Sequence, residues 1–370
     1  MKKRICIVGG GNLGHYIAAK LGNKQLVNIY TRNAEAWCSE IEAEDITGIS
    51  FFGAVQKASE KPQEVISDAE VIFITWPTNV LNERLAEIEP YINHDAWVCF
   101  CPGYGGKEFI SMSLLKKGVH IFGTQRVFSS TKVEQYGKKV ICIDNRPSIQ
   151  VGAVKKVDLQ PCCELIENLF EKKCIPYDNY LNITLTPSNP VLHTSRLYSL
   201  FKYYEPGIVY DYHFKFYSEW SEDSSNVLIK YDDEVQQICK QLSDMNLTGV
   251  KSLKEHYEIA NVPDCNNDCE RMTQKIKSLK FLKDFAPMVP QRDGFIPDFN
   301  SRYFQEDFIF GLCVIRAFAE ILQTDTSQMD KILSWFKKLL GSEVLEKGHP
   351  ALPQCHGILT KEEIYDFYLK

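Results

Sequence analysis

A histidine near the middle of the chain is the residue best suited to acid–base chemistry. His193 lies in the run from Ser188 to Arg196, and Pro190 fixes the backbone just ahead of it. The ordinary pKa of histidine is close to neutrality, so its ring can both donate and accept a proton. Reduction of a carbonyl or an imine by hydride needs such a donor near the reacting group. The sequence therefore makes His193 a candidate general acid.

A carboxylate partner would orient this ring and stabilise its protonated form. The best candidate is Asp307, which stands with Arg302 at the start of an apolar helical stripe that begins at Phe308. The dipole of a helix stabilises an acid at this end. Asp307 could equally be only a helix cap, and Arg302 only one half of a surface ion pair. Separation along the chain says nothing about distance, so the pairing of His193 with Asp307 stays open at this point.

The start of the chain has the spacing of a dinucleotide-binding loop. The apolar run 5–8 is typical of a buried parallel strand, and it leads directly into a G-x-G-x-x-G motif. Gly9 permits the tight turn, Gly11 lets backbone amides approach a pyrophosphate, and Gly14 allows close packing of helix on strand. Alone the motif is weak, but its place between a strand and a helix strengthens it. The residues predicted to bind the dinucleotide here are Gly9, Gly11, Asn12, Leu13 and Gly14.

The end of the second predicted strand bears on which dinucleotide binds. A site selective for NAD(H) usually has an acid roughly 20 residues beyond the glycines, which binds the ribose 2′-hydroxyl. This chain has Thr31 and Arg32 after the strand 26–30, and these groups suit a 2′-phosphate. NADP(H) is therefore favoured, and NAD(H) remains an option. The other interpretation is that Arg32 only faces solvent or stacks on adenine.

Strands and helices alternate through the first half of the chain. This rhythm predicts an α/β fold with an N-terminal Rossmann-like, doubly wound and mostly parallel sheet. Further strand candidates are 71–75, 97–101, 120–125 and 140–143. Ligands bind beyond the carboxyl ends of strands in such sheets. The loops expected to border the cofactor are therefore 75–77, which contains Pro77, 102–106 and 124–125.

From about residue 180 helical patterns replace this rhythm. We therefore expect a dinucleotide-binding domain over 1–180 and a mainly α-helical substrate domain over 181–370. The acids of Asp232-Asp233-Glu234 are interpreted as the first turn of a helix. The aromatic-rich segment 201–220 is expected to serve packing, with a wall of the substrate site as the alternative.

Composition excludes several classes of protein. A chain of 370 residues is long enough for two domains, and 44% hydrophobic with 24% charged residues is typical of a soluble globular protein. A net charge of −6 argues against a nucleic-acid partner. No apolar run approaches a membrane span or a signal-peptide core. The 13 cysteines are expected to be reduced thiols of a cytoplasmic protein, and no metal site is predicted, since Cys265 and Cys269 have no further ligands at suitable spacing.

Taken together, the motifs resemble the octopine/nopaline-type opine dehydrogenase family over nearly the whole chain. The specific segments are 189–193 and 302–307; the supporting ones are 9–14, 34–37, 102–106 and 124–125. The resemblance implies an NAD(P)H-dependent reductive condensation of a 2-oxo acid with the amino group of an amino acid.

The resemblance also implies roles for particular residues. It makes His193 the catalytic histidine and Asp307 its partner, and it places Arg302 at the substrate carboxylates. Gln125 is expected near the oxo acid. The chain departs from the family at Trp76, where a small apolar residue is usual, and this puts the shape of the nicotinamide or substrate pocket in doubt.

Two other functions stay open from the sequence. One is a reductase of a simple 2-oxo acid or phosphorylated ketone with the same architecture, and the other is a non-catalytic protein that senses NADP. In every case the expected partners are small molecules, without nucleic acid or membrane, and the chain is expected to be a monomer or a homodimer.

Overall fold

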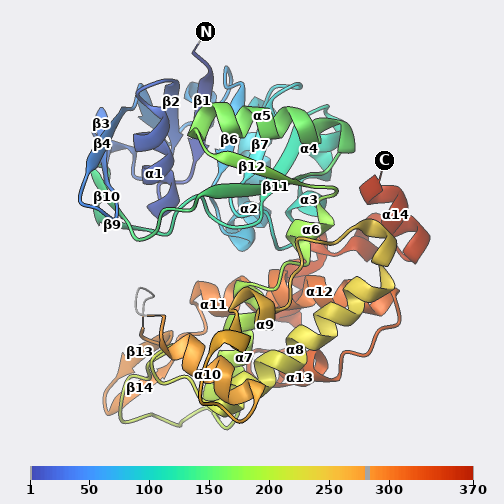
Figure 1. Ribbon diagram of the computed structural model, residues 1–370. Coiled ribbons are helices and arrows are strands. Elements are labelled where there is room, and N and C mark those ends of the chain that lie inside the picture. Colours follow the sequence, from blue (N-terminus) through green and yellow to red (C-terminus); the bar gives the residue numbers. More distant parts are fainter. Residues whose placement is uncertain (1, 280–283, 370) are drawn as a thin grey trace. The chain divides into compact units, whose positions relative to one another are not determined.

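The chain folds into two compact units (Figure 1). The structure is a computed structural model that describes residues 2–279 and 284–369. The first unit contains the residues up to Thr184 together with those from Tyr365 onward, and the second extends from Leu185 to Ile364. The sequence led us to expect 1–180 and 181–370. The segment from Tyr365 thus lies with the first unit, although its sequence position suggested the second.

An eight-stranded sheet forms the centre of the first unit. Its strand order is β12-β11-β8-β7-β6-β1-β2-β5. All neighbouring strands are parallel except β11 and β8, so the expected mostly parallel, Rossmann-like sheet is confirmed. The strands are β1 (Arg4–Val8), β2 (Leu26–Tyr30), β5 (Lys57–Ser59), β6 (Val71–Ile74), β7 (Trp97–Phe100), β8 (His120–Thr124), β11 (Ser148–Ala153) and β12 (Lys173–Tyr177).

Helices of the first unit bury their apolar sides in the same core as these strands. Leu13, Ile17 and Leu21 of α1 share one hydrophobic cluster with Ile166 and Leu169 of α5. The 3.6-residue period of the helix explains why these positions face one way. The helices are α1 (Asn12–Leu21), α2 (Thr78–Ile88), α3 (Lys107–Ile110), α4 (Met112–Lys116), α5 (Leu159–Phe170) and α6 (Leu181–Thr184).

A second sheet of four strands packs beside α1. Its order is β4-β3-β10-β9, and each of its strands contacts α1. The strands are β3 (Glu40–Glu44), β4 (Ser50–Ala54), β9 (Thr131–Gln135) and β10 (Lys139–Cys142). We had expected the strand near 140–143 to extend the main sheet, and that expectation is wrong. Buried and half-buried residues alternate along β10, because it covers α1 with one face only.

A buried acid joins distant parts of the first unit. Glu108 of α3 is fully buried, and its Oε1 accepts hydrogen bonds from the hydroxyls of Thr184 and Tyr368. Its Oε2 has no hydrogen-bond partner among the described residues. Burial raises the pKa of Glu108 to about 7. Tyr368 belongs to α14 (Lys361–Leu369), so this bond ties the end of α14 to the first unit.

The second unit is mainly helical, as expected. A single hairpin of β13 (Met288–Gln291) and β14 (Gly294–Pro297) is its only sheet in the part of the chain that the structure describes. Its helices are α7 (Asn189–Phe201), α8 (Glu222–Gln241), α9 (Leu253–His256), α10 (Asp268–Lys277), α11 (Arg302–Gln305), α12 (Cys313–Ile321) and α13 (Ser327–Leu340). No helix formed by the described residues combines the length and apolar character that a membrane crossing requires.

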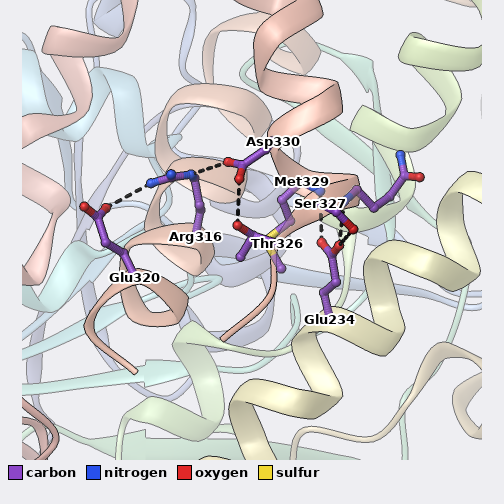
Figure 2. Close-up of polar contacts among 8 residues, drawn as sticks. Glu234, Arg316, Glu320, Thr326, Ser327, Met329 and Asp330 are labelled. Carbon is purple, nitrogen blue, oxygen red and sulfur yellow. Dashed lines mark hydrogen bonds and ion pairs between the residues drawn. The ribbon is translucent and has the colours of Figure 1, made fainter. Parts of the chain in front are cut away.

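The acids 232–234 do not open a helix, so that expectation is wrong. The helix α8 begins ten residues earlier at Glu222, where Ser221 caps it by accepting the Ser224 N–H. Glu234 instead accepts the backbone N–H groups of Gln328, at 2.5 Å, and Met329, at 2.9 Å (Figure 2). A buried acid in the middle of one helix therefore caps the N-terminus of another, α13.

Candidate active site

The start of α7 positions His193. Pro190 lies in the first turn of this helix, where its missing N–H leaves no hydrogen bond unmade. His193 follows within the next turn, and only 3% of its surface is exposed. The sequence suggested only that Pro190 fixes the backbone ahead of His193, and the structure places this proline at the start of the helix that carries the histidine.

His193 and Asp307 form a buried pair. The Nδ1 atom of His193 lies 2.7 Å from Oδ2 of Asp307, and both side chains are almost completely buried. Because a carboxylate can only accept, Nδ1 carries a proton, and Nε2 is the nitrogen left for exchange with a substrate. Oδ1 of Asp307 has no hydrogen-bond partner among the described residues.

A π-helical turn brings Asp307 to the histidine. Residues Asp307–Leu312 form this turn, in which the Gly311 N–H donates to the carbonyl of Glu306. A Cβ atom at position 311 would lie 2.5 Å from Cβ of Pro190. Glycine therefore lets the turn pack directly against the start of α7. The sequence suggested one continuous helix opened by Arg302 and Asp307, whereas the structure has α11, this turn and α12 in succession.

Aromatic side chains enclose the His193 ring. The ring centroids of Tyr303 and Phe216 lie 4.3 Å and 5.5 Å from its own. The hydroxyl of Tyr217 lies 3.4 Å from Nε2. Burial raises the pKa of Tyr217 well above its usual range, so the phenol remains neutral and can donate to Nε2. Sequence reasoning missed Tyr217, although the aromatic density of 201–220 was a signal for it.

Arg302 lies near this group of residues with its side chain about half exposed. Its Nε atom is 3.6 Å from the buried carboxylate of Glu306. The positive charge of Arg302 favours ionisation of the phenols of Tyr217 and Tyr303, but burial outweighs it and raises the pKa of both. A cation at the edge of a buried histidine is suited to bind a substrate carboxylate.

The glycine loop has the geometry that a pyrophosphate needs. Gly9 adopts a φ of +118° and donates its N–H to the Tyr30 carbonyl. A Cβ atom at position 14 would lie 2.1 Å from the carbonyl oxygen of Gly9, so only glycine permits this packing. Gly11 precedes α1 without a capping side chain, and nothing lies within 4 Å of where its Cβ would be. The space beside Gly11 at the start of α1 is therefore open, which fits a dinucleotide phosphate.

Two residues of the motif have side-chain contacts of their own. Asn12 accepts the Val133 N–H through Oδ1 at 2.9 Å, which ties the loop to β9. Leu13 belongs to the hydrophobic core, so only its backbone is placed to meet a cofactor.

Thr31 and Arg32 differ in exposure. The Thr31 hydroxyl is buried and lies 3.1 Å from the hydroxyl of Tyr136. Arg32 is exposed two residues beyond the end of β2. Its guanidinium is thus accessible to a ligand, whereas the hydroxyl of Thr31 already has a protein partner.

Pro77 and Trp76 follow β6 near the glycine loop. Pro77 occupies the position before the first residue of α2. Trp76 is buried, and a Cβ atom at position 9 would lie 3.2 Å from its indole ring. The guanidinium of Arg84 lies 4.9 Å from the centre of the Trp76 ring. Trp76, where we expected a departure from the family pattern, therefore places a large ring beside the glycine loop.

Gln125 lies at the end of β8 in the first unit. Its Oε1 accepts a hydrogen bond from the Tyr177 hydroxyl at 3.2 Å, and its backbone N–H donates to Gln150. The Tyr177 hydroxyl thus positions the side-chain amide of Gln125, and the bond to Gln150 positions its backbone. Among the described residues there is no group of three or more histidine, cysteine or acidic side chains that could hold a metal ion.

Known proteins resemble the chain in both units. The family model for the α-helical domain of NAD/NADP octopine/nopaline dehydrogenase matches residues 176–340. The family model for ketopantoate reductase PanE/ApbA matches residues 5–156. Tauropine dehydrogenase from Arabella iricolor is 26% identical over 97% of this chain and 99% of its own length. Opine dehydrogenase from Haliotis discus hannai is 24% identical, covering 98% and 99%.

A solved structure supports the same fold. Octopine dehydrogenase with NADH and L-arginine superposes with a TM-score of 0.80 at 20% identity, over 98% of this chain and 97% of that one. The likeness therefore extends through both units, from the glycine loop to the helices that carry His193 and Asp307.

Proposed function

We propose that His193, Asp307 and Arg302 perform the chemistry of this chain, which belongs to the octopine/nopaline-type opine dehydrogenase family. The chain is an NAD(P)H-dependent oxidoreductase that joins a 2-oxo acid to the amino group of an amino acid or a related amine. The observation that carries the assignment of roles is the buried contact of 2.7 Å between His193 and Asp307.

The roles follow from the direction of the hydrogen bonds. Asp307 fixes the proton on Nδ1 of His193 and stabilises the doubly protonated ring. Nε2 then delivers a proton to the substrate, either to the hydroxyl that leaves as water when the imine forms or to the nascent amine nitrogen. A nicotinamide held at the glycine loop would supply the hydride that reduces the imine carbon. Arg302 pairs with a substrate carboxylate and so fixes which face of the imine is presented. Gln125 orients the oxo acid through its held amide.

The residues also support a preference for NADPH over NADH. The chain has an exposed arginine after β2, at the place where NAD-selective sites usually have an acid. Gly9, Gly11 and Gly14, with the backbone of Asn12 and Leu13, would hold the pyrophosphate, and Pro77 would border the nicotinamide side. Arg32 would bind the 2′-phosphate, with Thr31 shaping the pocket behind it.

A crossed oxidation screen tests the assignment of His193. Oxidation of NADPH and NADH is measured with oxo acids and amino acids in all pairs, on the wild type and His193→Ala. We expect turnover only when both substrates are present, and a loss of at least about 100-fold in the variant. His213→Ala is the matched control, because the hydrogen bond of this histidine found among the described residues goes to a backbone carbonyl of the same unit. An equal rate in wild type and His193→Ala would remove His193 from the mechanism.

The same screen separates the other functions. Oxidation of NADPH by an oxo acid without an amine would indicate a simple oxo-acid reductase. Binding of the cofactor without oxidation across the whole panel would indicate a sensor protein.

The cofactor preference is tested on Arg32→Ala. Loss of a cation at a phosphate should raise the KM for NADPH by about tenfold. The KM for NADH serves as the internal control and is expected to change less than about twofold, since NADH lacks the 2′-phosphate. An equal change for the two cofactors would contradict the role given to Arg32.

We further propose a cytoplasmic protein whose partners are small molecules, without a nucleic-acid or membrane partner. All 13 cysteines are free thiols, and seven of them are buried, which suits a reducing compartment. The net charge of −6 disfavours nucleic acid. Light scattering on the purified chain decides between the proposed monomer and homodimer.

A further inference from the structure

A second buried histidine lies next to the glycine loop. His15 belongs to the first turn of α1 and has no exposed surface. Its Nδ1 atom is 2.8 Å from the carbonyl oxygen of Gly11, and its Nε2 atom is 2.7 Å from the backbone nitrogen of Gly137. Both ring nitrogens are thus used in hydrogen bonds to backbone groups.

These partners fix the protonation state of the ring. The Gly137 N–H can only donate, so Nε2 must present its lone pair. The Gly11 carbonyl can only accept, so Nδ1 must carry the proton. His15 is therefore neutral in this arrangement. Burial lowers the pKa of His15, which acts in the same direction.

Gly137, the partner of Nε2, is itself fixed by contacts with the segment 36–38. Gly137 lies in the turn between β9 and β10 with a φ of +72°, and its carbonyl accepts the Cys38 N–H at 2.9 Å. A Cβ atom at position 137 would lie 1.8 Å from the carbonyl oxygen of Ala36. The turn can therefore approach the segment 36–38, and its N–H can reach His15, only because residue 137 is glycine.

Further contacts join the same turn to the dinucleotide site. The His15 ring packs on Trp37 with the centroids 4.2 Å apart and meets Tyr136 edge-on at 5.2 Å. The Tyr136 hydroxyl lies 3.1 Å from that of Thr31. Asn12 is tied to β9 through Val133. The β9–β10 hairpin thus touches the glycine loop at Gly11 through His15 and directly at Asn12, and it also contacts Thr31, which follows β2.

We propose that His15 is a positioning residue for the cofactor, which holds the carbonyl of Gly11 against the β9–β10 turn so that the first N–H groups of α1 face the pyrophosphate. This rests on the proposed role of the glycine loop in binding the dinucleotide. His15 itself needs no contact with the cofactor. Its effect is to keep the loop in the conformation that binds, before the cofactor arrives.

Two variants at position 15 test this role against a matched control. His15→Phe keeps an aromatic ring on Trp37 and removes both hydrogen bonds, whereas His15→Gln retains one donor and one acceptor. The control is His120→Phe, because His120 of the same unit also stacks on a tryptophan, Trp97, at 4.5 Å and forms one hydrogen bond, to Asp158.

We expect His15→Phe to raise the Kd for NADPH, measured by calorimetry, by about tenfold or more through the loss of two hydrogen bonds. His15→Gln should restore part of the affinity, and His120→Phe should leave it within about twofold of the wild type. The kcat at saturating NADPH should change little in all three, because the loop does not touch the reacting atoms.

Three results would overturn the proposal. One is a Kd for His15→Phe within twofold of the wild type. Another is an equal loss of affinity in His15→Phe and His120→Phe, which would indicate general destabilisation. If His15→Phe does not fold, the test rests on His15→Gln, with Gly11→Val as the reference for a disrupted loop. A wild-type Kd for NADPH in His15→Gln then supports the role of His15. A Kd as weak as that of Gly11→Val contradicts it. Failure of the wild type to bind NADPH or NADH would show instead that the glycine loop has another function.

Discussion

Two buried histidines, one in each unit, differ in what surrounds them. His15 in the first unit is 0% exposed and His193 in the second is 3% exposed, and each has both ring nitrogens in hydrogen bonds. Both hydrogen bonds of the His15 ring go to backbone groups, whose donor and acceptor roles are fixed. His193 contacts a carboxylate and a phenol, and the phenol can either donate or accept.

The hydrogen-bond partners of a buried histidine, more than its burial, therefore decide whether its ring can transfer a proton. A second proton on His15 would point at the N–H of Gly137, so that ring stays in one state. A second proton on His193 is balanced by Asp307 and can be directed to the oxygen of Tyr217 or of a substrate. We therefore infer a positional role for the first ring and proton transfer for the second.

The largest expected effect comes from giving His193 a neutral partner, as His15 has. Asp307→Asn removes the charge that stabilises the protonated ring and allows the wrong tautomer. We expect kcat to fall by about 1,000-fold, while the Kd for NADPH stays within about twofold. Steady-state kinetics and calorimetry measure the two quantities, with Asp298→Asn of the same unit as control. A fall in kcat of less than tenfold would show that the charge of its partner does not distinguish His193 from His15.

Glu108 is another buried titratable group, and its protonation state changes near neutral pH. The pKa of Glu108 is raised from an ordinary 4.5 to about 7 in the folded chain. The folded state then binds more protons than the unfolded state between these values, so its stability is greatest below about pH 4.5 and falls as pH rises toward 7. The loss amounts to at most about 3 kcal/mol.

Glu108→Gln should remove this dependence, because the amide oxygen still accepts from Thr184 and Tyr368 but does not ionise. Thermal unfolding is followed from pH 5 to pH 8 for the variant, the wild type and Glu60→Gln, an exposed control. We expect the variant to gain stability relative to the wild type as pH rises. Parallel curves of stability against pH for all three proteins would show that Glu108 keeps one protonation state over this range.

The smallest expected effect concerns the second partner of His193. Tyr217→Phe removes the hydroxyl at Nε2 and should lower kcat by about tenfold and shift the pH profile of kcat. Tyr303→Phe is the matched control, since Tyr303 packs on the same ring and the hydrogen bond to Nε2 comes from Tyr217. Equal effects of the two substitutions would mean that packing alone accounts for Tyr217.

Local patterns in the sequence predicted the glycine loop and five of the eight strands of the main sheet, but not β5, β11 and β12. Apolar runs such as 5–8 and 71–74 form parallel strands that are buried on both faces. Such strands are easy to recognise because their residues are apolar throughout. The strand β3, Glu40–Glu44, was missed because acids alternate with its two buried residues. The acids 232–234 were misread because a rule about the first turn of a helix does not reveal an acid that caps another helix.

Some residues of the site could likewise be found from local sequence, whereas others depend on contacts between distant segments. His193 could be found from its neighbours in sequence, but its pairing with Asp307 depends on a π-helical turn, which has no sequence signature of its own. Asp307 was a candidate from its place before an apolar helical stripe, and the resemblance to the family made it the expected partner of His193. His15 stands directly after the glycine motif and was still overlooked, because its second partner, Gly137, is far away in the chain.

The contact between Tyr368 and Glu108 has a consequence for the order in which the protein matures. During synthesis the residues up to Thr184 leave the ribosome before any of the second unit, and Tyr368 follows after nearly all of it. Until then the carboxyl of Glu108 has only one of its two hydroxyl donors. The unit that contains the glycine loop therefore becomes complete only after the unit that carries His193 has been made.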